Sequence, residues 1–199
     1  MRNLVRFFAA AVAVAACSSA PSQTPAVGPS PAVSPPVTRP VPPPPTRSAA
    51  SFRTATATIR DGAGARIGEA TFTDSYAGLL IAGSVEGLGI GAHGIHIHEA
   101  GKCEPPFTTA GGHYNPEKHK HGFRNAEGHH LGDLPNIDVP PSGRLRFQFL
   151  LPDVTLRGPH GLLDGNGSSI VIHSTRDDLA TDPSGNSGAR LACGVIVQS

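Results

Sequence analysis

Two histidines separated by one residue stand within an alternating apolar run, Gly94-Ile95-His96-Ile97-His98-Glu99. The alternation predicts a β-strand in which His96 and His98 point to one face and the two isoleucines to the other. Imidazole is a good ligand for zinc and copper, so two imidazoles on one face of a stiff strand make half of a metal site. The alternative is a pair of polar side chains on a solvent-facing strand, and this run alone does not decide between the two.

Further candidate metal ligands follow along the chain. They are His113, His121, His130, Asp133 and, at the end of a later apolar run, His173. Together with the first pair they make six histidines and one aspartate, more than the four ligands of one tetrahedral zinc ion. Two metals that share a ligand would use all seven. The remaining histidines, at positions 93, 119, 129 and 160, are not assigned to a site.

The chain from residue 52 onward predicts an all-β domain that would position these ligands. Short alternating or apolar runs are separated by Gly, Pro and Asp turns, and no helical periodicity exceeds two turns. Eight short strands indicate an antiparallel sandwich or barrel. The predicted strands are 53–60, 67–73, 77–85, 94–99, 131–139, 144–150, 169–173 and 191–197.

Two connections between the predicted strands are too long to be turns, residues 99–130 and 174–190. Both are rich in His, Asp and Gly and poor in large apolar side chains. Loops of this length in a compact domain are usually functional or disordered. Because the first carries candidate ligands, we expect it to be functional.

The N-terminus predicts export. Residues 1–16 carry two arginines and then an apolar stretch too short to cross a bilayer as a helix, as in a signal peptide. Val14-Ala15-Ala16-Cys17 resembles the lipobox of bacterial lipoproteins, which implies cleavage before Cys17 and a lipid on its sulfur. The alternative is an ordinary secretory signal with an incidental cysteine. In either case the chain leaves the cytoplasm, and in the first it is anchored to a membrane.

Residues 17–50 predict an extended tether. This segment holds more than half of the chain's 20 prolines and almost no large apolar side chains, so it cannot bury enough surface to fold. A proline-rich docking ligand is the alternative. The net charge of +1 gives no indication of a nucleic-acid partner.

From residue 52 to residue 198, within a predicted domain of residues 51–199, the chain resembles the Cu/Zn superoxide dismutase family. The resemblance implies an eight-stranded antiparallel Greek-key sandwich or barrel with two long functional loops. It rests on motifs that occur in the family's order: Gly94-Ile95-His96-Ile97-His98-Glu99, Gly112-His113-Tyr114-Asn115-Pro116, Lys120-His121-Gly122, His130-Leu131-Gly132-Asp133-Leu134, Val171-Ile172-His173 with Asp177-Asp178, and Gly185-Asn186-Ser187-Gly188-Ala189-Arg190-Leu191-Ala192-Cys193-Gly194-Val195.

The resemblance also implies roles for the candidate residues. Superoxide would be converted to dioxygen and hydrogen peroxide by a copper ion that cycles between two oxidation states, beside a structural zinc ion. His113 would be an imidazolate bridge between the metals, Arg190 would attract the anionic substrate, and Asp177 would join a copper ligand to a zinc ligand. Copper would be bound by His96, His98, His113 and His173, and zinc by His113, His121, His130 and Asp133.

Cys103 and Cys193 are an even pair in an exported domain, and a disulfide between them would close a loop of about 90 residues. The chain-entropy model gives such a bridge roughly 4–5 kcal/mol. Two free thiols are the alternative.

The sequence also allows two functions other than an enzyme: a copper or zinc binder without activity, and a structural domain that has lost its metals. Intact His173 and Arg190 favour the enzyme, because a metal store needs neither. The segment after His98 is short where family dimers often form their contact, which leaves a monomer and a homodimer open.

Overall fold

The computed structural model describes residues 52–199, and the predicted signal, Cys17 and the tether of residues 17–50 lie outside the described residues. Nearly all regular structure in the described part is β-strand. Within it, no helix has the length and apolar character needed to cross a membrane. The elements are β1 (Thr54–Asp61), β2 (Arg66–Ser75), β3 (Gly78–Glu86), β4 (Gly91–His93), β5 (Ile95–His98), the 3₁₀-helix η1 (Thr108–Ala110), β6 (Ile137–Val139), β7 (Arg144–Leu151), β8 (Ser169–His173), β9 (Arg190–Val195) and β10 (Val197–Gln198).

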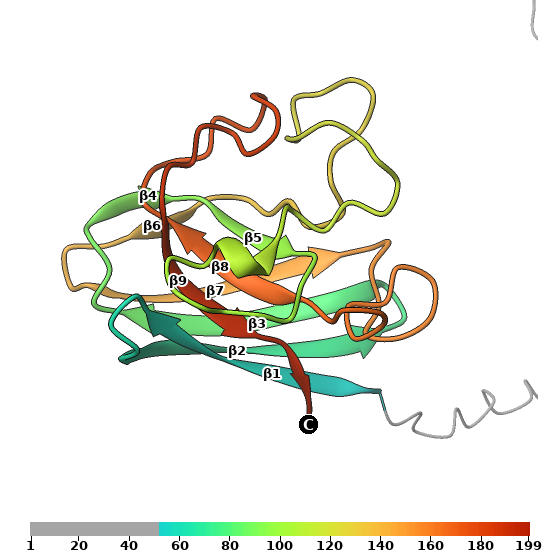
Figure 1. Ribbon diagram of the computed structural model, residues 1–199, viewed down its shortest axis with the longest axis horizontal. Coiled ribbons are helices and arrows are strands. Elements are labelled where there is room, and N and C mark those ends of the chain that lie inside the picture. The colour runs from blue at the N-terminus through green and yellow to red at the C-terminus, as the bar shows by residue number, and fades with distance from the viewer. Residues whose placement is uncertain (1–51) are drawn as a thin grey trace, which may run out of the picture. The chain divides into compact units, whose positions relative to one another are not determined.

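Eight strands form one antiparallel sheet, and the other two form a separate pair. The order in the sheet is β5-β8-β9-β1-β2-β3-β7, with β10 beside β1, while β4 pairs with β6. The sheet curls around its own inner face (Figure 1), where the apolar core lies. Neighbours such as β9 and β1, or β3 and β7, are distant in sequence, as a Greek-key connection requires. The predicted all-β antiparallel fold is confirmed.

Alternating side chains explain why these segments pair as they do. In β1, Ala55, Ala57 and Ile59 are fully or almost fully buried, whereas the threonines between them face outward. In β7, Phe147 points inward and its two neighbours point to solvent. A one-residue slip in register would expose every one of these apolar side chains, so the pattern fixes the pairing.

The predicted strand 131–139 is wrong over most of its length, because only Ile137–Val139 is extended in a ladder. Its first residues instead fold over β5. The N–H of Ile97 donates to the carbonyl of Gly132 at 2.9 Å. The N–H of Gly132 in turn donates to the carbonyl of Tyr114 at 2.8 Å. A Cβ at position 132 would lie 2.3 Å from the carbonyl oxygen of Ile97, so this contact requires glycine.

One further predicted strand is interrupted and one short strand, β4, was not predicted, so the described chain has ten strands where eight were predicted. β4 ends just before Gly94, where the predicted strand of the first histidines begins, and the N–H of Gly94 donates to the carbonyl of Thr175 in the second long loop at 2.8 Å. The predicted last strand divides at Ile196, which is buried and donates its N–H to Ser168 at 3.0 Å. In both places the backbone N–H donates to a loop carbonyl and not to a neighbouring strand, so the strand ends there.

The two long loops lie on the same side of the sheet (Figure 1) and are hydrogen-bonded to each other. The first extends over residues 99–136, longer than predicted, and the second over residues 174–189. The N–H of Arg124 in the first donates to the carbonyl of Leu179 in the second at 3.0 Å. The loops therefore form one layer over the sheet edge that carries β5 and β8.

Candidate metal centre

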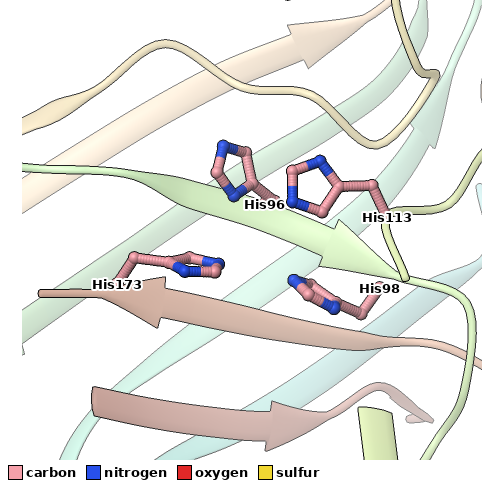
Figure 2. A group of neighbouring side chains, drawn as sticks. All are labelled: His96, His98, His113 and His173. Atoms are coloured by element: carbon pink, nitrogen blue, oxygen red, sulfur yellow. The ribbon is translucent and has the colours of Figure 1, made fainter. Parts of the chain in front are cut away.

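Four histidines from separate parts of the chain converge on one point (Figure 2). His96 and His98 come from β5, His173 from the end of the neighbouring β8, and His113 from the first long loop. One ring nitrogen of each lies within 4.8 Å of those of the others. All four side chains are buried, so the alternative of a solvent-facing histidine pair is wrong.

The ring nitrogens that face this point lack any protein partner. They are Nδ1 of His96 and Nε2 of His98, His113 and His173, and each is buried without a hydrogen bond. Buried polar atoms are nearly always paired. Four unpaired imidazole nitrogens around one point are what a bound cation would satisfy, and imidazole suits copper. This group therefore fits a copper ion.

The opposite ring nitrogens are held by hydrogen bonds that fix the tautomer. His96 donates from Nε2 to Oδ2 of Asp177 at 2.7 Å. His98 donates from Nδ1 to the carbonyl of Gly111 at 3.1 Å, and His173 from Nδ1 to that of Gly188 at 3.3 Å. Each donation leaves the other nitrogen as a lone pair directed at the common point, which is the form that binds a metal.

A second group adjoins the first and contains His113, His121, His130 and Asp133. Oδ1 of Asp133 lies 2.9 Å from Nδ1 of His113, 2.9 Å from Nδ1 of His121 and 3.3 Å from Nδ1 of His130. The Nδ1 atoms of His130 and His113 are 3.4 Å apart. Ligands of a tetrahedral zinc ion with bonds of ~2.0–2.1 Å are about 3.3–3.4 Å apart, so the group fits zinc.

His113 belongs to both groups. It presents Nε2 to the first and Nδ1 to the second. Asp177 links the groups from outside, since its Oδ1 accepts from Nε2 of His121 at 3.0 Å while its Oδ2 accepts from His96. The side chain of Asn136 holds the backbone of Asp177: its Nδ2 donates to the carbonyl of Asp177 and its Oδ1 accepts the N–H of Asp177, at 2.8 Å each. No sequence signal marked Asn136, because its role depends on how the two loops meet.

Burial and charge separate the two groups electrostatically. Burial, together with His96, lowers the pKa of His173 to about 3, and burial lowers that of His113 to about 4 in spite of Asp133. For His121, burial opposes protonation, but the hydrogen bonds to Asp133 and Asp177 outweigh it and raise its pKa to about 9. The first group is thus a set of neutral imidazoles, and the second contains one carboxylate, that of Asp133, which attracts a cation.

Arg190 lies at the start of β9, directly paired with His173 across the ladder. Its guanidinium donates to the carbonyls of Phe107 and Gly111, at 2.6 Å each. The carbonyl of Gly111 also accepts from His98, so one peptide orients a ligand histidine and the arginine together. Arg190, His113 and His173 line the same open pocket.

The disulfide between Cys103 and Cys193 is confirmed, with a Cα–Cα distance of 5.6 Å. It ties the first long loop to β9 three residues beyond Arg190. The same loop carries the two carbonyl groups that hold the guanidinium. The bridge therefore restrains the segment on which the position of Arg190 depends.

Among the unassigned histidines, His93 contacts the backbone of His173, one of the four histidines of the first group. It is buried, with Nδ1 2.7 Å from the carbonyl of His173 and Nε2 2.9 Å from that of Gly89. His129 does not enter either group, because its ring packs against Phe123 with centroids 4.4 Å apart. The structure thus brings together all seven predicted ligands and leaves His129 outside.

Comparisons with known proteins agree with this arrangement. Residues 66–196 match the family model described as copper/zinc superoxide dismutase. Superoxide dismutase [Cu-Zn] 1 of Aquifex aeolicus is 45% identical over 137 residues, covering 67% of this chain and 81% of the relative. An extracellular superoxide dismutase [Cu-Zn] of Caenorhabditis elegans is 42% identical over 136 residues, covering 65% and 60% of the two chains. The crystal structure of a double mutant of a SOD-like protein from Bacillus subtilis superposes with a TM-score of 0.69 at 41% identity, covering 71% and 96%.

Proposed function

The chain belongs to the copper/zinc superoxide dismutase family, and we propose that it converts superoxide to dioxygen and hydrogen peroxide outside the cytoplasm. Copper and zinc are the cofactors of this family. The observation that carries the proposal is the set of four buried, unpartnered imidazole nitrogens directed at one point. A structural domain without metals would leave these nitrogens unpaired at a cost of about 1–3 kcal/mol each.

The two groups divide the cofactors by their chemistry. His96, His98, His113 and His173 would hold copper, and His113, His121, His130 and Asp133 would hold zinc. Bound copper would supply a centre that exchanges one electron with superoxide, whereas zinc has no redox chemistry. The shared ring of His113 would bridge the two metals.

The chain's own groups would bind the substrate and supply a proton. Arg190 carries a permanent positive charge in the open pocket, which attracts a monoanion and orients it toward His113 and His173. Nε2 of His113 has no partner in the protein and faces the copper group, so it could hold a proton only while it is not bound to copper. Asp177 and Asp133 keep the ligand rings in place while this happens.

Metal analysis of the purified protein with a superoxide assay tests the proposal. We expect one copper and one zinc per chain and a rapid, copper-dependent loss of superoxide. His173→Ala should abolish the activity while the fold persists, because three remaining histidines cannot hold copper in the same geometry. Near-normal activity of the copper-loaded variant would refute the role of His173, and an inactive metal-loaded wild type would refute the proposed reaction.

We propose that the domain is exported and anchored through a lipid on Cys17, with residues 17–50 as its tether. An extracellular relative supports export. Cys17→Ser should give a secreted or unprocessed protein in place of a membrane-bound one, as cell fractionation and mass spectrometry of the N-terminus would show. If the processed variant remains with the membranes as fully as wild type, the lipid anchor is refuted. Sedimentation of the purified domain distinguishes a monomer from a homodimer.

A further inference from the structure

His130 differs from the other proposed ligands in how its outer ring nitrogen is held. The rings of His96 and His121 are oriented by Asp177, and those of His98 and His173 by backbone carbonyls. His113 uses both nitrogens within the metal groups. For His130, the group that faces Nε2 in the described chain is the carboxylate of Asp182. Its Oδ1 lies 3.8 Å away, beyond direct hydrogen-bond distance.

Asp182 is already fixed to the neighbouring ligand segment. The same Oδ1 atom accepts the backbone N–H of His121 at 2.8 Å. Asp182 therefore lies beside two of the ligands proposed for zinc. It is hydrogen-bonded to the backbone of His121 and faces the ring of His130. It belongs to the second long loop, which also supplies Asp177. The carboxylates of this loop thus face the ligand group from two directions.

The side chain of Asp182 has room to complete the contact. It is 53% exposed, whereas the side chain of His130 is only 6% exposed and cannot turn freely. A carboxylate oxygen can accept two hydrogen bonds, so Oδ1 could keep the N–H of His121 and also accept from Nε2 if the present separation of 3.8 Å shortened. The hydrogen bond would place the proton on Nε2 and leave Nδ1, 3.3 Å from Asp133, as the lone pair for a metal.

We propose that Asp182 is a positioning residue that orients His130 for zinc. The inference rests on the proposed zinc group and adds to it an outer carboxylate contributed by the second long loop. Partners of this kind hold the ring orientation and raise ligand basicity, and their loss typically weakens metal binding about 10–100-fold.

Zinc affinity, measured by competition with a chromophoric chelator, tests this role. Asp182→Ala should weaken zinc binding about 10–100-fold. Asp182→Asn should lose less, because an amide oxygen can still accept from both His121 and His130. Asp138→Ala is the matched control, since it removes the same charge from an exposed position of β6. The absorption spectrum of cobalt bound at the zinc site gives a second readout, and it should change in Asp182→Ala but not in Asp138→Ala.

The outcomes separate this inference from the proposed function. A wild-type protein that binds no zinc or cobalt at this group would refute the proposed site itself. A wild type that binds zinc, with an Asp182→Ala variant of equal affinity and unchanged cobalt spectrum, would refute the role of Asp182 alone. A loss no larger than that of Asp138→Ala would show a general charge effect and would also overturn it. If Asp182→Ala does not fold, Asp182→Leu, which has a side chain of similar shape but no hydrogen-bond acceptor, decides by the same two measurements.

Discussion

At the residue scale, the geometry of the site depends on the hydrogen bonds that orient each side chain. His98 and Arg190 donate to the same carbonyl, that of Gly111. One peptide unit thereby orients both a proposed copper ligand and the arginine proposed to attract the substrate. Since an arginine presents a rigid planar fork of donors, it holds this carbonyl and that of Phe107 together with less loss of side-chain freedom than a lysine would need.

Arg190 provides the sharpest residue-scale prediction. Arg190→Glu should lower the second-order rate with superoxide about tenfold or more, and further than Arg190→Lys, with unchanged metal content. Higher ionic strength should slow the wild type, because charges are screened over roughly 8–10 Å at moderate salt. The glutamate variant should lose or reverse this slowing. Equal rates and equal salt slopes for all three proteins would mean that Arg190 does not guide the substrate.

The buried histidines lead to a prediction about pH in the metal-free protein. Unfolded histidines protonate near pH 6.5, whereas folded His173 and His113 do so only near pH 3 and pH 4. Between these values the unfolded chain binds more protons, so the free energy of unfolding falls as the pH decreases below about 6.5. His121, with a pKa of about 9, acts in the opposite sense, and its contribution is lost as the pH rises through 9.

We therefore expect the melting temperature of the metal-free protein to be highest near pH 6–7 and to fall on both sides. Calorimetry in the presence of a chelator measures this. His129→Gln, a half-buried histidine outside both groups, should leave the profile unchanged. A flat profile from pH 4 to pH 9 would contradict the assigned protonation states.

At the scale of elements, the site is built by two strands and two loops that are held together by few connections. The β5–β8 pairing sets three of the four histidines of the first group. The loops supply the rest, and Asp177 and the Cys103–Cys193 bridge fasten them to the sheet. Phe107, Leu131 and Leu134 of the first loop are also buried in the apolar clusters, so these connections add to hydrophobic packing in holding that loop.

Removal of the bridge tests this view. Cys103→Ser combined with Cys193→Ser should lower the free energy of unfolding by about 2–5 kcal/mol. The rate with superoxide should also fall in the metal-loaded protein, because the loop that holds Arg190 is released from β9. Urea unfolding and the superoxide assay measure the two effects. Cys17→Ser, which leaves the bridge intact, is the control, and equal stability of the double variant and this control would contradict the prediction.

At the scale of the whole molecule, metal binding and folding are linked. The zinc group joins segments around His113, His121 and His130 that come together only in the folded chain. A ligand that binds only the folded state stabilises it by mass action, by about 4 kcal/mol when its concentration is a thousand times Kd. We therefore expect zinc to act on stability more than on the reaction.

Asp133→Ala should accordingly lower the melting temperature more than it lowers the activity of copper-loaded protein. Asp133 is the only charged oxygen donor in its group, and three imidazoles alone bind zinc more weakly. Thermal unfolding with saturating zinc and with a chelator measures the contribution directly. Identical melting temperatures of wild type under the two conditions would show that zinc adds nothing to stability.

The sequence by itself determined the class of fold and the membership of the candidate site. Alternation predicted the strand at 53–60 that the structure has as β1, and the spacing of His96 and His98 predicted that both lie on one face of a strand. Both follow from local geometry, because side chains alternate along any strand. The tertiary structure decided what local pattern cannot encode. It gave residues 131–136 to the loop layer, joined Asn136 to the backbone of Asp177, and brought Asp182 to within 3.8 Å of His130. These contacts join segments far apart in the sequence, so only the packing of the two loops on the sheet could determine them.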